Sequence, residues 1–364
     1  MPTRDVPEFD PVKSPVIGVL LCNLGTPDAP TPSAVRRYLA EFLSDPRVVE
    51  IPAALWKPIL HGVILPRRPR QSAEKYGKVW LPEGSPLQVW TEKQALLLRG
   101  WLGERGHDRV RVRHAMRYGK PSIADQLTAL REQDRCEHIL VVSLYPQYSA
   151  TTTASVIDAV NAWTAEQRDI PELRFANRFF ADPGYIRALA RRVMEHWQQH
   201  GQPDQLVMSF HGIPERNVQR GDPYARECEA TAALLAERLA LKPNQFKLTY
   251  QSRFGRAKWL EPYTQPTIES LARQGARRVD VVCPGFVSDC LETLEEIGLE
   301  CRDAFLAAGG QEFHQIPCLN DSRAWMAALV GIVEDHLGGW STRGCAAETR
   351  LPQVAPHTAS APLR

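Results

Sequence analysis

The sequence predicts an α/β protein of two doubly wound, Rossmann-like domains with parallel sheets and a cleft between the domains. Three observations carry this prediction. The chain has 364 residues, which corresponds to about two domains of ordinary size. Short apolar runs bounded by Gly, Pro or Asp are typical of buried parallel strands. Longer amphipathic segments separate these runs, and such alternation is typical of βαβ units.

Eight segments rich in Val, Ile, Leu and Phe are expected to form the strands. In chain order they are 16–22, 109–113, 138–144, 173–176, 206–210, 246–250, 279–283 and 312–316. The polar stretch 164–172 interrupts the alternation, so we expect an N-terminal domain at 14–168 and a C-terminal domain at 169–338. The polar segment 339–364 is expected to be a disordered tail.

Several helices between the strands have recognisable starts. Proline is favoured at the first helical position, and it opens three predicted helices, at Thr31-Pro32, Asp182-Pro183 and Asp222-Pro223. Residues 44–86 fit the alternation poorly, because an apolar segment there is followed by the basic patch 66–70. One interpretation of 44–86 is a lip of the cleft or a weak peripheral membrane contact. The alternative is an irregular insertion packed on the first domain.

Composition excludes several classes of protein. The chain is 43% hydrophobic and 24% charged, which is ordinary for a globular protein and excludes a disordered one. The formal net charge is only +2, so no nucleic-acid partner is expected. No run approaches the roughly 18 to 20 apolar residues of a membrane span. The N-terminal segment does not resemble a signal peptide, and none of the eight cysteines forms a CxxC pair. We therefore expect a cytoplasmic enzyme.

Polar side chains follow the predicted strands, where ligands bind in open α/β sheets. They are Asn23, Arg117, Tyr118, the run 145–149, His211, Gln251, Ser252, Pro284 and Gly285. Two facing sets of this kind predict an interdomain site. No GxGxxG follows a strand and no GxxxxGK[ST] is present, so nucleotide binding is not indicated.

His211 and an acidic run are the main candidates for chemistry. A neutral imidazole accepts a proton near pH 7 or binds a divalent metal; the alternative for His211 is a structural histidine. Glu292 and Glu296 are four residues apart and share a helical face, where they suit a divalent cation and a proton relay. The alternative for Glu292 is a capping box with Asp289 as the N-cap.

Other polar and aromatic residues are candidates for holding a substrate. Arg117 and Tyr118 are able to clamp a carboxylate, or Arg117 forms an ordinary surface ion pair. Tyr145, Tyr148 and Phe179 are able to stack on a flat ligand, or they close a core.

With these residues placed, the chain resembles the ferrochelatase family over about residues 14 to 337. The resemblance rests on an ordered set of motifs: NLGTP (23–27), EGSPLQVWTEKQ (83–94), MRYGKP (116–121), YPQYSATTTAS (145–155), SFHGIPERNVQRGDPY (209–224), YQSRFGRAKWLEPYT (250–264) and PGFVSDCLETLEEI (284–297). It implies insertion of Fe²⁺ into protoporphyrin IX with release of two protons, which gives protohaem in the terminal step of haem synthesis.

The resemblance also implies roles for individual residues. His211 matches the family histidine that accepts pyrrole protons and binds metal, Glu292 matches a second metal-site residue, and Glu296 lies on the acidic path beyond it. The remaining positions line the porphyrin side of the cleft: Leu24, Arg117, Tyr118, Tyr145, Phe179 and Ser209. Fe²⁺ is a substrate in this reaction, and no prosthetic group is implied.

Some features of the chain depart from the family pattern, and others indicate its cofactor content, oligomeric state and substrate. Many members read SDH before the family glutamate, whereas this chain has Cys290 there. A [2Fe–2S] cluster needs four thiolates, but only Cys345 lies beyond Cys318, so no cluster is expected. The long C-terminal extension of eukaryotic members is missing, which favours a monomer. The coproporphyrin III branch typically has Tyr at the position of Leu24, so protoporphyrin IX is favoured and coproporphyrin III is the alternative.

Two other functions are compatible with a two-domain α/β chain, and Cys290 is a candidate reactive group. A two-lobed metal or tetrapyrrole carrier would bind the same ligands without turnover. An α/β hydrolase with His211 as base lacks the GxSxG elbow. A helix N-terminus lowers the pKa of a cysteine, so we expect Cys290 to be accessible and to bind soft metals; the alternative is a buried, inert thiol.

Overall fold

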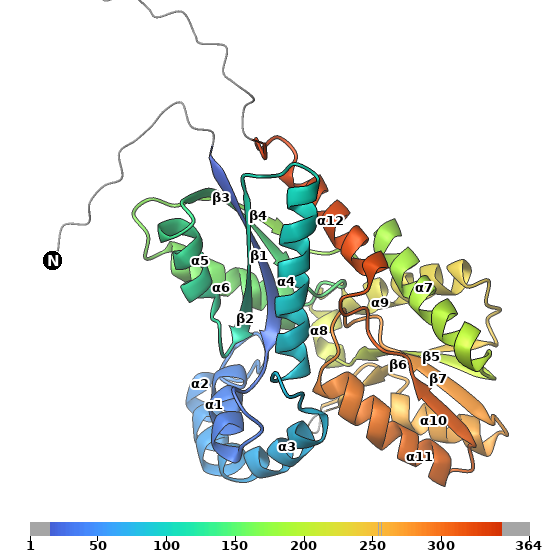
Figure 1. Ribbon diagram of the computed structural model, residues 1–364. Coiled ribbons are helices and arrows are strands. Elements are labelled where there is room, and N and C mark those ends of the chain that lie inside the picture. The colour runs from blue at the N-terminus through green and yellow to red at the C-terminus, as the bar shows by residue number, and fades with distance from the viewer. Residues whose placement is uncertain (1–14, 254, 256, 344–364) are drawn as a thin grey trace, which may run out of the picture.

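The strands form two parallel four-stranded sheets in a computed structural model that describes residues 15–253, 255 and 257–343 (Figure 1). The first sheet has the order β2-β1-β3-β4, and the second has the order β6-β5-β7-β8. The bounds are β1 Val16–Gly25, β2 Val110–Tyr118, β3 Cys136–Ser143, β4 Glu172–Ala176, β5 Gln205–His211, β6 Phe246–Gln251, β7 Arg278–Val282 and β8 Glu312–Gln315. The predicted fold class and all eight predicted strands are confirmed.

Helices connect the strands, and two of the three predicted starts, Thr31-Pro32 and Asp182-Pro183, are confirmed. The third is wrong, because α9 begins at Tyr224 with Pro223 at the N-cap position and no side-chain cap. Thr31 caps the first helix, since its Oγ1 accepts a hydrogen bond from Ala34 N at 3.4 Å. Asp182 caps α7 by accepting from Tyr185 N at 2.8 Å. Outside residues 53–79 the helices are α1 Pro32–Phe42, α4 Pro86–Glu104, α5 Ile123–Glu132, η2 Ala150–Ala154, α6 Ser155–Thr164, α7 Pro183–His200, α8 Glu215–Gln219, α9 Tyr224–Arg238, α10 Thr264–Arg273, η3 Glu292–Cys301, α11 Arg302–Ala307 and α12 Arg323–Leu337.

The division between the two halves differs from the expected one. β4 pairs with β3 and therefore belongs to the first sheet, so this sheet extends beyond residue 168. The last helix, α12, returns from the second half and packs on α7 and α4, between the two sheets (Figure 1). One continuous hydrophobic core contains residues of both sheets and of these three helices, including Leu21, Leu98, Val193, Met208 and Leu329.

Residues 44–86 are largely helical rather than irregular. They contain α2 Ala53–Ile59, the π-helical turn η1 Leu60–Ile64 and α3 Leu65–Val79. Leu60 and Leu65 are buried with residues of α1 and with Tyr118. The opposite side of the segment exposes apolar side chains, which are Ile51, Leu55, Ile59 and Val63.

The end of the described chain packs on the first half. Trp340 is buried, and the Arg174 guanidinium lies 3.9 Å from the centre of its ring. Residues 339–343 are thus an ordered extension, contrary to the expected disordered tail, and 344–364 lie outside the described residues.

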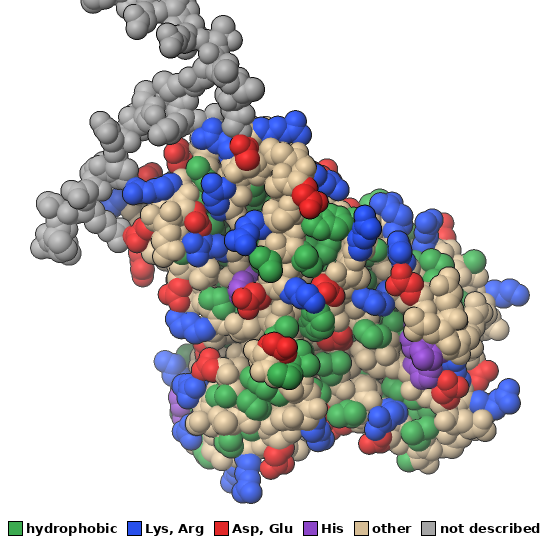
Figure 2. Space-filling view, in the orientation of Figure 1, with side chains coloured by type: hydrophobic (Ala, Val, Ile, Leu, Met, Phe, Trp, Pro, Cys, Tyr) green, Lys and Arg blue, Asp and Glu red, His purple; other side chains and the backbone are tan. Residues whose placement is uncertain are grey.

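The described surface carries mixed charges. Basic and acidic side chains are interspersed over the face drawn in Figure 2, in keeping with the small net charge. Within the described ranges, no helix is both long and apolar enough to cross a membrane.

Candidate functional site

His211 is the last residue of β5 and lies beside Gln251 at the end of β6. Its ring is half-buried, and its Nδ1 lies 2.6 Å from the carbonyl oxygen of Gly212. Because a carbonyl oxygen only accepts, Nδ1 carries the proton and Nε2 keeps its lone pair. The backbone of the next residue therefore selects the tautomer in which Nε2 is the basic atom.

Polar side chains at the ends of β5 and β6 hold the neighbouring helix in place. Ser209 Oγ donates to Gln251 Oε1 at 2.7 Å, and Gln251 Nε2 donates to the carbonyl oxygen of Glu292 at 2.9 Å. Ser209 is fully buried, so it is not exposed in the cleft as expected; it positions Gln251 instead. The chain Ser209–Gln251–Glu292 fixes the start of η3 against the sheet.

Glu296 is the carboxylate that interacts with His211. Its oxygens accept from Ser252 N at 2.7 Å and from the Ser252 hydroxyl, and Ser252 has φ of +65°. Burial raises the pKa of Glu296, while the Ser252 hydrogen bonds and a positive charge on His211 lower it. A half-buried carboxyl with a raised pKa near a basic imidazole is suited to receive a proton.

Glu292 faces the first half of the molecule. Burial raises the pKa of Tyr38, Tyr76 and Tyr145, and the negative charge of Glu292 raises each of these pKa values further. These tyrosines come from α1, α3 and the loop after β3. Glu292 thus lies on the side of η3 near the first half, where its neighbour Leu291 packs against the cluster that contains Tyr38 and Tyr76.

The capping box proposed for Glu292 is absent. The side chain of Asp289 accepts from Thr293 Oγ1 at 2.8 Å and from Asn320 Nδ2 at 2.7 Å, and Leu291 occupies the N-cap position without a side-chain cap. Asp289 therefore ties the preceding loop to the segment before α12. The carboxylate of Glu292 is left available for a function in the cleft.

The helix that carries both glutamates is a π-helix of ten residues, η3. π-helical segments are rare in proteins, and many of those that occur lie at functional sites. Three ion pairs join η3 to α3 across the boundary between the halves. Glu295 lies 3.0 Å from Lys75 Nζ and 2.9 Å from Lys78 Nζ, and Glu300 lies 2.7 Å from Lys75 Nζ. Because Glu295 is buried, these pairs fix the rotation of η3 about its own axis.

Leu24 and Tyr145 lie where two strands of the first sheet end. Both are partly exposed. Glu292 and Cys290 both act on the pKa of Tyr145. The structure thus brings Leu24, Tyr145, Glu292, Glu296 and His211 to the junction between the two sheets.

Comparison with known proteins agrees with this arrangement. A model of the family "Ferrochelatase" matches residues 16–337. The chain belongs to the ferrochelatase family. A ferrochelatase of Polaromonas sp. (strain JS666 / ATCC BAA-500) is 63% identical over 92% of this chain and 90% of that protein. A ferrochelatase of Methylibium petroleiphilum is 64% identical over 89% of this chain and 89% of that protein.

A solved structure described as SirB from Bacillus subtilis with Fe³⁺ has the same fold. Its TM-score is 0.53 at 12% identity, and the match covers 89% of this chain and 96% of that one. At this identity the similarity supports the fold alone. The two parallel sheets of the chain are therefore those of a chelatase-like protein.

Two residues assigned to the porphyrin side of the ferrochelatase cleft lie elsewhere. Arg117 donates to Asp45 Oδ2 at 2.6 Å, and the Tyr118 hydroxyl donates to the same oxygen at 2.7 Å. Arg117 also donates to Ser155 Oγ at 2.7 Å. Tyr118 is fully buried, so in this conformation it does not line the cleft. The ion-pair alternative describes Arg117 correctly, although the pair is largely buried.

The expected aromatic stacking residues separate into two groups. Phe179 is buried in the core between the halves, where it stacks on Trp325 at 5.7 Å between ring centroids. It therefore closes the core and does not line the ferrochelatase cleft. Tyr148 is half-buried and carries Arg178 over its ring at 5.0 Å.

The exposure of Cys290 differs from the expectation. Its side chain is buried, and burial raises the pKa of its thiol well above the usual value. The prediction of an accessible, reactive thiol is therefore wrong. The sequence indicates Ser252 only as a residue that follows a strand, and it does not indicate Tyr38 or Tyr76. Ser252 could have been singled out from its position, whereas the tyrosines belong to helices of the first half and no spacing indicates them.

Proposed function

We propose that this chain inserts Fe²⁺ into protoporphyrin IX, with release of two protons, to give protohaem in the terminal step of haem synthesis. The observation that carries the proposal is the free Nε2 of His211 near the half-buried carboxyl of Glu296, in a chain of the ferrochelatase family. A carrier of the same ligands needs no proton acceptor, because binding alone releases no pyrrole proton.

In the proposed mechanism, His211 removes the pyrrole protons. Its Nε2 accepts each proton, and the resulting imidazolium is stabilised by its Nδ1–H bond to Gly212 and by the charge of Glu296. Glu296 then receives the proton, since burial has raised its pKa toward that of an imidazole. Ser252 holds the carboxylate in position during this exchange.

Glu292 is proposed to bind the incoming iron. A carboxylate oxygen is a hard ligand that exchanges readily, as delivery of Fe²⁺ requires. The phenol groups of Tyr38, Tyr76 and Tyr145 face the same carboxylate and keep it polar while excluding bulk water. The bound ion can then pass from Glu292 to the four ring nitrogens.

Ring distortion is proposed to come from the shape of the cleft. Binding a bent macrocycle more tightly than a flat one stabilises the transition state rather than the substrate. Leu24 and Tyr145 on the first half and His211 on the second supply opposing surfaces. The core shared by both sheets keeps these surfaces at a constant separation.

The proposed porphyrin is protoporphyrin IX. Leu24 is an apolar residue that packs on the cluster of Val35, Leu39 and Leu60, and it offers no hydrogen bond to an additional carboxylate. Coproporphyrin III carries additional carboxylates where protoporphyrin IX has vinyl groups. We therefore expect a higher kcat/KM for protoporphyrin IX, and a higher value for coproporphyrin III would replace the proposed substrate.

An anaerobic steady-state assay with Fe²⁺ and protoporphyrin IX tests the proposal. Multiple turnovers are expected, whereas stoichiometric binding without turnover would support a carrier. His211→Gln retains a donor for the Gly212 carbonyl but has no basic nitrogen, so we expect a loss of at least ~10²-fold in kcat with little change in porphyrin affinity. His114→Gln, a half-buried histidine on β2, is the matched control and is expected to retain activity.

We also propose that the chain is a monomer, carries no iron–sulfur cluster and is located in the cytoplasm. The seven cysteines within the described residues are free and buried. Sedimentation equilibrium and iron and sulfide analysis of the purified chain test the first two points. A dimer, or two irons with two sulfides per chain, would contradict them.

The exposed apolar face of α2 and η1 is proposed to contact a membrane weakly. Leu55 is 65% exposed and Val63 is 43% exposed, and Lys57 and Arg67 are exposed beside them. Apolar side chains flanked by basic ones bind to anionic lipid surfaces. Co-sedimentation with anionic vesicles should fall for Leu55→Ser and stay unchanged for Leu306→Ser, an exposed leucine on α11. Equal binding of both variants would contradict this contact.

A further inference from the structure

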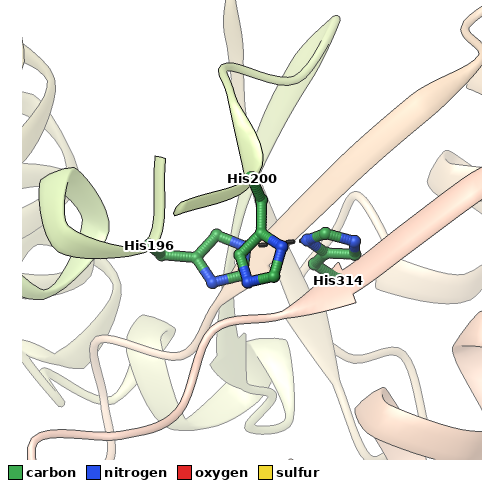
Figure 3. A group of neighbouring side chains, drawn as sticks. All are labelled: His196, His200 and His314. Atoms are coloured by element: carbon green, nitrogen blue, oxygen red, sulfur yellow. Dashed lines mark hydrogen bonds between the residues drawn. The ribbon is translucent and has the colours of Figure 1, made fainter. Parts of the chain in front are cut away.

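Three histidines gather at the end of the second sheet that lies opposite His211. His196 and His200 are four residues apart in the last turns of α7, and His314 lies on β8 (Figure 3). One ring nitrogen of each histidine lies within 4.8 Å of those of the other two, and His196 Nε2 is 2.8 Å from His314 Nδ1. The three rings point toward one another, as Figure 3 shows. They form a ligand set that the proposed function does not use.

Hydrogen bonds around His314 determine which of its nitrogens faces the other rings. Nε2 lies 2.9 Å from Glu312 Oε1, and because a carboxylate only accepts, Nε2 carries the proton. Nδ1 therefore has its lone pair directed at His196 and also lies 3.4 Å from Arg278 Nη2. A carboxylate behind a ligating histidine is the usual outer partner in metal sites.

The charges next to the cluster allow a cation. Asp280 is fully buried and has one oxygen 3.6 Å from His196 Nε2. Arg278 is the competing positive group, but its guanidinium is paired with both oxygens of Asp280, at 3.0 and 3.1 Å. With Glu312 added, these three groups sum to one negative charge. A divalent ion bound between the histidines would thus meet a net attraction.

The geometry suits a tetrahedral ion after a small adjustment. Zinc–nitrogen bonds of ~2.0–2.1 Å place two ligand nitrogens about 3.3 Å apart. The two nitrogens now at 2.8 Å would move apart by about 0.5 Å, and His200 would move inward. His200 is exposed, so its ring has room to move. Figure 2 shows histidine side chains at the surface of the half that carries the second sheet, where an ion has access.

The cluster is separate from the proposed iron site. His314 pairs with Asp280 of β7, and Asp280 pairs with Leu206 at the start of β5, whereas His211 is at the end of that strand. Five residues of a strand extend about 17 Å. An ion held by the three histidines is therefore out of reach of a porphyrin at His211.

We propose that His196, His200 and His314 form a second metal site that binds a borderline divalent ion, with Zn²⁺ as its representative. Three imidazoles with an open fourth position suit Zn²⁺, Cu²⁺ or Ni²⁺ better than Mg²⁺ or Ca²⁺. Binding displaces the proton shared between His196 and His314 and ties the end of α7 to the edge strand β8.

Calorimetric titration of the full chain with Zn²⁺ tests the proposal. The His211→Gln background weakens binding at the iron site, and in it we expect one Zn²⁺ per chain. Adding His200→Ala should weaken that Kd more than tenfold, because it leaves two ligands. Adding His61→Ala, another exposed histidine, should leave the Kd within twofold. No Zn²⁺ binding in the background, or equal Kd values for the two added variants, would overturn the proposal.

Chemical protection gives a second measurement that needs no variant. Diethylpyrocarbonate modifies unligated imidazoles, and mass spectrometry identifies each modified histidine. We expect Zn²⁺ to reduce modification of His200 at least tenfold and to leave His61 unchanged. Equal modification of His200 with and without Zn²⁺ would contradict the site, even if the substituted chains did not fold.

Discussion

Replacing Asp45 by Ala tests whether Arg117 and Tyr118 act in stability rather than in substrate binding. Asp45 is 6% exposed and accepts four hydrogen bonds, from Arg47 N, Arg117, Tyr118 and Ser155. Removal of one partner of a buried ion pair costs ~3–5 kcal/mol. The Arg117 side chain is 19% exposed and can be partly rehydrated, so we expect the lower end of this range, about 3 kcal/mol.

This loss converts to a measurable change in melting temperature. The unfolding entropy is about 2.1 cal/mol/K per residue, or roughly 0.7 kcal/mol/K for the residues 16–337 that form the family domain. A loss of about 3 kcal/mol therefore lowers Tm by about 4 °C, which differential scanning calorimetry resolves. Asp45→Ala should leave KM for the porphyrin unchanged, because the carboxylate does not face the cleft.

The pH dependence of the same variant is a further check. Burial acts to raise the pKa of Asp45, but the hydrogen bonds from Ser155, Tyr118 and Arg47 and the charge of Arg117 outweigh it and lower the pKa. A lowered pKa contributes stability above the unfolded value of about 3.9, and this stability is lost as pH falls through the folded value. The Tm difference should therefore be constant at neutral pH and decrease below pH ~4.

A double-mutant cycle decides between the two roles of Arg117. If Arg117 stabilises the fold through Asp45, Arg117→Ala lowers Tm and its effect is not additive with Asp45→Ala. An unchanged Tm for Arg117→Ala together with a raised KM would refute this reasoning and restore Arg117 to the cleft.

Three further predictions concern the acidic helix. Glu292→Gln should lower kcat at least ~10²-fold at an unchanged Tm, because the residue has no capping role; a fully active variant would remove Glu292 from the mechanism. Glu296→Gln should remove the acid limb of the pH profile of kcat/KM, since burial raises the pKa of this carboxyl; an unaltered limb would assign it to another group. Cys290 should resist iodoacetamide in the native protein and react in denaturant, as peptide mapping would report; native labelling would contradict its burial.

The sequence was sufficient for the strands because their signal is local. A run such as Val16 to Cys22 is apolar on both faces, which is typical of a strand covered by helices on both sides. His211 and Glu296 could be singled out because His211 is at the end of β5 and Glu296 lies on the helix that follows β7. The same reasoning misassigned β4, because nothing in the polar stretch 164–172 shows on which side of it the first sheet ends.

The rest depended on tertiary contacts that no spacing encodes. The sequence predicts that Tyr118 follows a strand that ends at residue 113, but β2 extends to Tyr118, and its hydroxyl turns inward to Asp45, which is 73 residues away. Cys290 lies before a helix, where the dipole would lower its pKa, but burial dominates and raises it. The four-residue interval between Glu292 and Glu296 predicts an α-helix, but η3 is a π-helix with i→i+5 hydrogen bonds, and nothing in the sequence indicates that form.

The core shared by both sheets limits how the cleft between them can change. Because α12 packs on α7 and α4 at once, a hinge motion of one half would have to break apolar contacts of Leu329 and its neighbours. Access for a flat ring must then come from local displacement of α1 to α3, and the ties of α3 to η3 include the lysine pairs with Glu295 and Glu300. For the same reason neither half is an exchangeable module. A sheet grafted onto another scaffold would lose the part of its hydrophobic core that the other half supplies.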